Sequence, residues 1–187
     1  MDLGLKGRRA IVTGGSKGIG RRCADILTAE GAHVSICART QTDIDSALTS
    51  MGTSGNSVHG AVVDVSDKEA LESWVAEAAT SLGGIDIVVG NVSALAVGDG
   101  EEAWEAGFAT DMMHCVRIVN AAMPFLEASD AASITLVSSV SGREIDFTGP
   151  AYGAFKAAIV HYACGLAYKL APKGIRANAV SPGNTYF

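Results

Sequence analysis

Short apolar runs alternate with longer, helix-length segments along the whole chain. The short runs are nearly continuous in apolar residues, as in Ile85–Val89 and Ile134–Val137, which is typical of parallel strands covered on both faces. Strands are predicted over Arg9–Thr13, His33–Ala38, Gly60–Val65, Ile85–Asn91, Ser133–Ser138 and Arg176–Val180. Helices are predicted over residues 18–30, 41–51, 67–82, 101–127 and 151–171.

This alternation predicts an α/β fold with a doubly wound parallel sheet of the Rossmann type. The chain has 187 residues, of which 48% are apolar, so one domain over residues 1–187 with a sizeable core is expected. In such sheets the ligand binds beyond the carboxyl ends of the strands. The residues that follow each strand are therefore where the chemistry is expected.

Charge and hydropathy exclude several classes of partner. The net charge of −6 comes from interspersed acidic and basic residues, so no nucleic-acid partner is expected. No apolar run approaches the roughly 20 residues of a membrane span, so no membrane partner is expected. Residues 1–7 lack the apolar core of a signal peptide, so a cytoplasmic protein is expected.

Cysteine and histidine are few and dispersed. No Cys-x-x-Cys occurs, and no His pairs with a Cys or a carboxylate at ligand spacing. Reduced, buried thiols and no metal site are therefore expected. The residues concerned are Cys23, Cys37, Cys115, Cys164, His33, His59, His114 and His161.

A glycine-rich loop joins the first predicted strand to the first predicted helix. Its glycines, Gly14, Gly18 and Gly20, allow backbone N–H groups to approach a diphosphate, whose charge a helix N-terminus favours. The spacing matches neither Gly-x-Gly-x-x-Gly nor the P-loop, so an ordinary glycine-rich turn is the alternative. The position between a strand and a helix favours nucleotide binding.

The second predicted strand ends in Ala38 and Arg39, where an enzyme that binds NAD usually has an acid for the ribose 2′-hydroxyl. Lys17 projects from the glycine-rich loop. Two cations without a carboxylate fit a 2′-phosphate, which a guanidinium can grip with two hydrogen bonds. NADP is therefore predicted over NAD, and two solvated surface charges are the alternative.

Tyr152 and Lys156 lie four residues apart in a segment predicted to be helical, so both side chains project from one face. An ammonium held beside a phenol favours the phenolate. This is the chemistry needed to protonate a carbonyl oxygen while a hydride arrives at the carbon. For the pair alone, the alternative is a solvated Lys beside a packed Tyr.

Together these motifs resemble the short-chain dehydrogenase/reductase family, in its single-domain branch and of the 3-oxoacyl-reductase-like kind. The resemblance covers essentially residues 6–186. Ser139 lies 13 residues before Tyr152, as the catalytic Ser of the family does. The other matching positions are Thr13, Gly14, Gly18, Ile19, Gly20, Asp64, Val65, Asn91, Lys156, Pro182 and Gly183.

The resemblance implies a role for each of these positions. Tyr152 would be the general acid in reduction and the base in oxidation, Lys156 would assist it, and Ser139 would orient the substrate oxygen. A small carbonyl or alcohol substrate is implied, as is a homodimer or homotetramer formed through the two long helices. The implied cofactor-binding residues are Gly14, Ser16, Lys17, Gly18, Ile19, Gly20, Arg39, Asp64, Val65, Asn91, Tyr152, Lys156, Pro182 and Gly183.

Four positions depart from the family pattern. Asn91 is followed by Val92 and Ser93 rather than Ala and Gly, and Phe155 takes a position that is usually small. Asp111, 13 residues before Pro124, stands where a catalytic Asn that holds a proton-carrying water is expected. Asp111 would accept from that water, or be a surface acid if the register differs by one turn.

The chain stops at Phe187, soon after Pro182 and Gly183, whereas the family usually continues for some tens of residues. The usual last strand and substrate loop are therefore expected to be lacking, which would leave Arg176–Val180 as an open edge prone to association. The favoured function is an NADP(H)-dependent oxidoreductase. A non-catalytic dinucleotide-binding protein or subunit is the alternative, to which Asp111 and the short end point.

Overall fold

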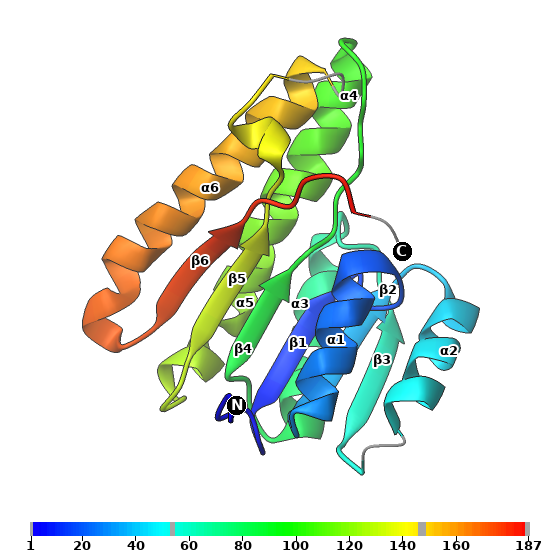
Figure 1. Cartoon of the computed structure of the whole chain (residues 1–187), viewed down its shortest axis with the longest axis vertical. Helices are drawn as coiled ribbons and strands as arrows, with labels where there is room; N and C mark the ends of the chain where they lie inside the picture. The colour runs from blue at the N-terminus through cyan, green and yellow to red at the C-terminus, as the bar shows by residue number, and fades with distance from the viewer. Residues whose placement is uncertain (1, 53–54, 146–148, 186–187) are drawn as a thin grey trace.

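The computed structural model describes residues 2–52, 55–145 and 149–185, and Phe187 lies outside them. The described residues form one parallel sheet with helices on both faces, in the order β3-β2-β1-β4-β5-β6 (Figure 1). The predicted doubly wound α/β fold is confirmed. The strands are β1 (Arg9–Thr13), β2 (His33–Ala38), β3 (Val58–Val62), β4 (Ile87–Gly90), β5 (Ser133–Val137) and β6 (Arg176–Val180).

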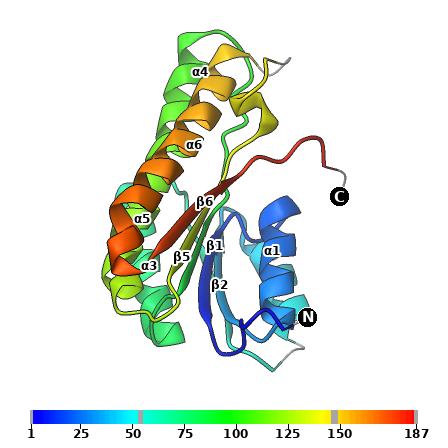
Figure 2. The ribbon, with the colours of Figure 1, turned by 60° about the vertical axis from the view of Figure 1, so that its left-hand side comes forward.

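Two sets of helices sandwich the sheet (Figure 2). Helices α1 (Gly18–Ala29) and α2 (Gln41–Met51) cover one face. Helices α3 (Lys68–Leu82), α5 (Met113–Glu127) and α6 (Pro150–Leu170) cover the other, with the short α4 (Glu101–Ala106) leading into α5. Single turns η3 (Val140–Gly142) and η4 (Ala171–Lys173) flank α6.

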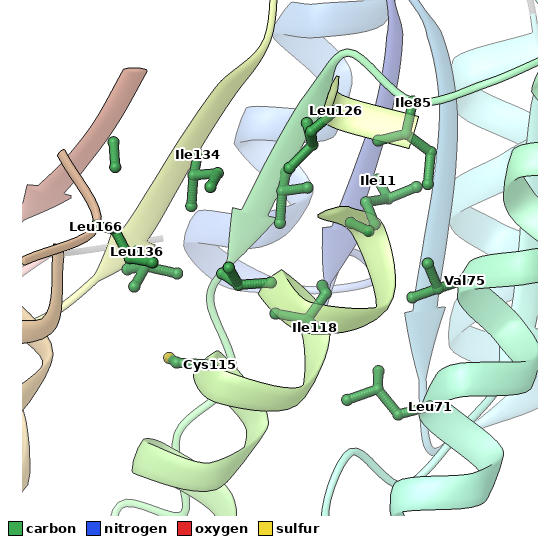
Figure 3. Close-up of a cluster of buried hydrophobic side chains, with 14 of the residues drawn as sticks. Ile11, Leu71, Val75, Ile85, Cys115, Ile118, Leu126, Ile134, Leu136 and Leu166 are labelled. Carbon is green, nitrogen blue, oxygen red and sulfur yellow. The ribbon is translucent and has the colours of Figure 1, made fainter. Parts of the chain in front are cut away.

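The core divides into two layers because strand side chains alternate between the faces. On β1, Ile11 packs with the cluster under α3, α5 and α6, whereas Ala10 and Val12 pack with the cluster under α1 and α2. Figure 3 shows the first cluster, in which Ile118 and Leu126 of α5 meet the sheet. Full burial of a side chain of this size contributes about 1.5–3 kcal/mol, so these contacts fix α5 and α6 on the sheet.

Two strand boundaries differ from the prediction. Strand β3 lies at Val58–Val62 rather than residues 60–65, because Val63 and Val65 bury their side chains beyond the end of the ladder. Val58, although half-exposed at the sheet edge, pairs with Val34. The apolar pattern therefore marks the buried residues, which here extend past the hydrogen-bonded strand. Strand β4 is shorter than predicted at both ends.

The predicted continuous helix over residues 101–127 is also wrong in its middle. Between α4 and α5 the chain forms a π-helical segment, η2 (Gly107–Met112). A Cβ atom on Gly107 would lie 2.5 Å from Cδ2 of Phe155 and 2.8 Å from its Cε2, so only glycine allows α6 to approach this closely. The bulky Phe155 is thus accommodated by the missing side chain at position 107. Such π segments often occur at functional sites.

The strand order reverses between β1 and β4, because the chain builds β2 and β3 on one side of β1 and then crosses over. At such a switch point the loops diverge and leave a crevice at the carboxyl ends of the strands. The segments that follow β1 and β4, which carry Gly14 and Asn91, meet there. The topology therefore places the predicted motifs at one edge of the sheet.

Candidate active site

An open cleft of about 820 Å³ lies at the carboxyl ends of the strands. It is lined from every strand end and from α6. Gly20 and Asp111, which were also predicted, do not line the cleft but contact the lining residues Gly14 and Lys156. The predicted residues that line the cleft are Gly14, Ser16, Lys17, Gly18, Ile19, Arg39, Asp64, Val65, Asn91, Ser139, Tyr152, Lys156, Pro182 and Gly183.

The glycine-rich loop presents a backbone surface suited to a diphosphate. Gly14 has a φ of +63°, which lets the chain turn sharply into α1. A Cβ on Gly20 would lie 2.4 Å from the carbonyl oxygen of Gly14, so a side chain there would push the loop apart. Helix α1 has no capping side chain and no acid in its first turn, so its N–H groups are left for an anion. These residues fit the diphosphate of a dinucleotide cofactor.

Asn91 ties the end of β4 to this loop. Its side-chain Nδ2 donates to the carbonyl oxygen of Thr13 at 3.0 Å and lies 3.4 Å from that of Gly14. Its backbone N–H donates to the hydroxyl of Thr13 at 3.0 Å. The side chain therefore holds two strand ends in register, and the Val92 and Ser93 that follow leave these contacts intact.

The Thr13 hydroxyl leads to a buried histidine that the sequence did not reveal. His114 Nε2 lies 2.9 Å from Thr13 Oγ1, and its Nδ1 lies 3.2 Å from the carbonyl oxygen of Thr110. A carbonyl oxygen only accepts, so the hydrogen-bond pattern assigns the proton to Nδ1 and leaves Nε2 to accept from Thr13. Burial lowers the pKa of His114 and so favours its neutral form, one helical turn after Asp111. The three-residue spacing between Asp111 and His114 was the only sign in the sequence that the two side chains lie on one helix face.

Asp111 and Lys156 form a buried ion pair. Oδ1 of Asp111 lies 3.0 Å from Nζ of Lys156, and each side chain is 2% exposed. The other carboxylate oxygen accepts from the N–H of Ala94 at 3.0 Å, and Nζ also donates to the carbonyl oxygen of Val137 at 3.3 Å. The contact at Oδ1 is an ion pair rather than an aligned hydrogen bond. The interpretation of Asp111 as a surface acid is wrong, because the side chain is buried.

Tyr152 lines the cleft beside this pair. Nζ of Lys156 lies 5.4 Å from the centre of the Tyr152 ring, one helical turn away on α6. Tyr152 is half-buried and lines the cleft, whereas Lys156 is 1% exposed. A tyrosine that lines the cleft beside a lysine is an arrangement that can donate a proton to a bound oxygen and recover it.

Three serines follow β5, and their hydroxyl groups are differently engaged. Ser139 Oγ donates to Ser141 Oγ at 3.1 Å and accepts from the N–H of Ser141 at 3.2 Å. Ser138 Oγ donates to the carbonyl oxygen of Lys156 at 2.7 Å and so anchors α6. Of these, Ser139 has a hydroxyl that lines the cleft without being committed to the helix backbone.

The segment after β6 closes one side of the cleft. Ser138 N–H donates to the carbonyl oxygen of Val180 at 2.8 Å, and Val140 N–H donates to that of Pro182 at 3.0 Å. Pro182 and Gly183 therefore run alongside Val140, which follows Ser139. In Figure 1 this segment crosses over the carboxyl ends of the strands towards α1.

The opposite end of the cleft carries charges of both signs. Lys17 Nζ lies 2.8 Å from Oδ2 of Asp43, in the first turn of α2. Asp64 accepts from the N–H and the hydroxyl of Ser66, and these hydrogen bonds, together with the charge of Arg39, hold the pKa of its carboxyl below the usual value. The two predicted cations are present, but Asp43 was missed because only the fold brings it to Lys17.

Acid should destabilise the folded chain through His114. Burial first, and then the charge of Lys156, lowers the pKa of His114 to about 4 from 6.5, while Asp111 acts the other way. Between these values the unfolded chain binds a proton and the folded chain does not, so stability falls as the pH drops from about 6.5 towards 4. His114 therefore contributes roughly 3 kcal/mol to the free energy of unfolding above this pH window, and this contribution is lost below it.

Urea unfolding of the parent and of His114→Gln across this pH window tests the expectation. The variant should lose most of the pH slope, whatever its absolute stability. His161→Gln, at an exposed position of α6, is the matched control and should keep the slope. Asp86, whose pKa is held at about 2, acts only at lower pH. An unchanged slope in His114→Gln would show that His114 is not the group responsible.

Within the described ranges, no helix is long and apolar enough to cross a membrane. No group of three metal-binding side chains was found among the same residues. All four cysteines are unpaired; Cys37 and Cys115 are buried, and burial raises the pKa of each thiol to about 12.

Comparisons with a family model and with individual known proteins agree on one family. The model for short chain dehydrogenases matches residues 8–186. Isoepoxydon dehydrogenase patN of Penicillium expansum is 42% identical over 188 residues, which cover 98% of this chain and 72% of that protein.

Solved structures superpose closely as well. A short-chain dehydrogenase from Burkholderia cenocepacia, in complex with NADP, has a TM-score of 0.92 at 30% identity, covering 97% of this chain and 76% of that one. Carveol dehydrogenase from Mycobacterium avium, in complex with NAD, has a TM-score of 0.90 at 28% identity, covering 95% and 70%. The sequence match and the shared fold together establish that this chain belongs to the short-chain dehydrogenase family.

Proposed function

We propose that this chain is an NADP(H)-dependent oxidoreductase that interconverts a ketone and a secondary alcohol. The observation that carries the proposal is the half-buried Tyr152 at the cleft with the buried Nζ of Lys156 5.4 Å from its ring centre. The bound cofactor supplies or removes the hydride, as in other nicotinamide enzymes. The protein positions and orients the substrate and the cofactor, and it transfers the proton.

In the direction of reduction, the proposed steps use three side chains. Ser139 donates to the substrate carbonyl oxygen and orients it, exchanging its present hydrogen bond to Ser141. The Tyr152 hydroxyl gives its proton to the same oxygen as the carbonyl carbon gains the hydride, so the product is the alcohol. The ammonium of Lys156 stabilises the phenolate that remains. Oxidation runs the same steps in reverse.

Asp111 is proposed to hold Lys156 and to take part in returning the proton to Tyr152. Its carboxylate is fixed by the N–H of Ala94 on one oxygen and by Nζ on the other. A fixed carboxylate keeps the lysine side chain extended behind Tyr152 rather than turned out to solvent. The role of the expected Asn would thus be filled by an ion pair.

For the cofactor, the support lies in the glycine-rich loop, the uncapped N-terminus of α1 and the cations Lys17 and Arg39. NADP is proposed over NAD on the basis of these cations. Similar structures contain either cofactor, since the Burkholderia enzyme holds NADP and the Mycobacterium enzyme holds NAD. Asp64 and Val65 are proposed to contact the adenine, and Pro182 and Gly183 the nicotinamide.

A homodimer or homotetramer through α5 and α6 stays a prediction. These helices share a hollow whose lining combines apolar residues, among them Val116 and Met123, with charged ones such as Glu127 and Lys169. A second copy of the same two helices would cover this hollow, and an apolar centre with a polar rim is the kind of surface that subunit contacts use.

The function is tested by incubating the chain with NADPH or NADH and a panel of ketones. The panel should span cyclic enones, ketoses and 3-oxoacyl thioesters, with alcohol formation measured alongside cofactor oxidation. We expect NADPH-linked reduction of at least one class. A dinucleotide-binding protein without catalysis is the second candidate, favoured by the carboxylate paired with Lys156. Tight NADPH binding without turnover on any ketone would support that candidate instead.

A further inference from the structure

The end of the cleft proposed to hold the cofactor's adenosine is not a purely cationic site. Nζ of Lys17 is 2.8 Å from Oδ2 of Asp43, and both residues line the cleft. Arg39 lies close enough to Asp64 for their charges to interact. A 2′-phosphate arriving here therefore meets two carboxylates as well as the two cations.

Asp43 is held in place more firmly than Lys17. It lies in the first turn of α2, where the partial positive charge of the helix N-terminus stabilises a carboxylate and no side chain caps the helix. Its side chain is 25% exposed, whereas that of Lys17 is 75% exposed. A phosphate can therefore draw the lysine ammonium towards itself, but the carboxylate stays beside it.

We propose that Asp43 is a specificity-determining residue that weakens the preference of this cleft for NADPH over NADH. This inference rests on the proposed NADP(H) site. Asp43 does so in two ways: it competes with the 2′-phosphate for Lys17, and its own charge repels the phosphate. The ribose 2′-hydroxyl of NADH is neutral and is affected by neither.

The size of the effect follows from simple electrostatics. A phosphate and a carboxylate that contact the same ammonium lie roughly 5–6 Å apart, and even in a water-like dielectric a dianion at that distance loses about tenfold in affinity. The site is open to solvent, so added salt should screen much of this repulsion. Removal of the carboxylate charge should therefore tighten NADPH binding, most strongly at low ionic strength.

The test is the Asp43→Asn variant, with dissociation constants for NADPH and NADH measured by fluorescence titration at low and high salt. Relative to the parent, the dissociation constant for NADPH should fall about tenfold at low salt, and that for NADH should stay within about twofold. At high salt the difference between the variant and the parent in NADPH affinity should become smaller. Asp45→Asn is the matched control, since it removes the same charge two residues further along α2, at an exposed position. The Asp45→Asn variant should change the dissociation constants for NADPH and NADH only slightly, and by a similar factor.

Arg39→Ala separates failure of this inference from failure of the proposed function. If Arg39→Ala weakens NADPH but not NADH, the 2′-phosphate binds at this end. An unchanged NADPH-to-NADH ratio in Asp43→Asn then overturns the role of Asp43 alone, as does a weaker NADPH affinity, which would mean that Asp43 positions Lys17 for the phosphate. If the parent binds neither cofactor, the proposed function fails and the inference with it.

Discussion

Replacement of Tyr152 by Phe is expected to lower ketone reduction by about 10² or more while NADPH still binds. The change removes only the hydroxyl of a residue that lines the cleft and leaves the ring in contact with Nζ of Lys156. Without a proton donor, the substrate oxygen would carry a developing negative charge beside a phenyl ring. The loss should therefore appear in kcat more than in the affinity for cofactor.

Single-turnover and steady-state rates with NADPH, together with cofactor titrations, measure this effect. Tyr168→Phe is the matched control, because Tyr168 lies on the same helix at 89% exposure. That variant should retain full activity. A Tyr152→Phe protein as active as the parent would place proton donation elsewhere, and Ser139 or Ser141 would become the first residues to test.

Most of the architecture was predictable because it follows from burial. The strands that pair at the sheet centre are nearly continuous apolar runs, so β1, β2 and β5 were predicted to within a residue. Strand β3 was misplaced because its first residues are held by backbone pairing at the edge rather than by burial. The π-helical η2 was missed because it depends on Gly107 meeting Phe155, which belongs to another helix.

The site was predictable where parallel topology brings strand ends together. The glycine-rich loop, Asn91 and Ser139 each follow a strand end, and they line one cleft together with Tyr152 of α6. His114 and Asp43 were not predicted, because their roles depend on which helix face turns inwards and on how α2 approaches the loop. Asp111 was placed by spacing alone, and only the structure shows that it contacts Lys156.

The buried pair Asp111–Lys156 gives the largest expected effect on stability. Lys156→Met keeps much of the side-chain volume but leaves a carboxylate in a site where each partner is 2% exposed. Breaking a buried pair in this way costs about 3–5 kcal/mol, because one charge remains without compensation. Activity should be lost as well, since the ammonium behind Tyr152 is gone.

The double variant Lys156→Met with Asp111→Leu distinguishes charge from packing. If the stranded carboxylate causes the loss, removing it should restore most of the free energy of unfolding, because well-packed apolar residues often replace a buried pair without loss. The free energy of unfolding of Asp111→Asn should fall between those of Lys156→Met and the double variant, since the Asn side-chain oxygen can still accept from the N–H of Ala94. If Asp111 relays protons, this variant should also keep or raise activity and shift the pH optimum.

Urea denaturation of the parent, Lys156→Met, Asp111→Leu and the double variant completes a double-mutant cycle, which isolates the coupling between the two positions. A coupling near zero would show that the pair does not stabilise the fold, and that the loss in Lys156→Met comes from packing instead. A large loss of activity in Asp111→Asn at every pH would show that the carboxylate charge is itself essential. A relay that works through any hydrogen-bonding group at position 111 would then be excluded, and the proton path would depend on the ion pair.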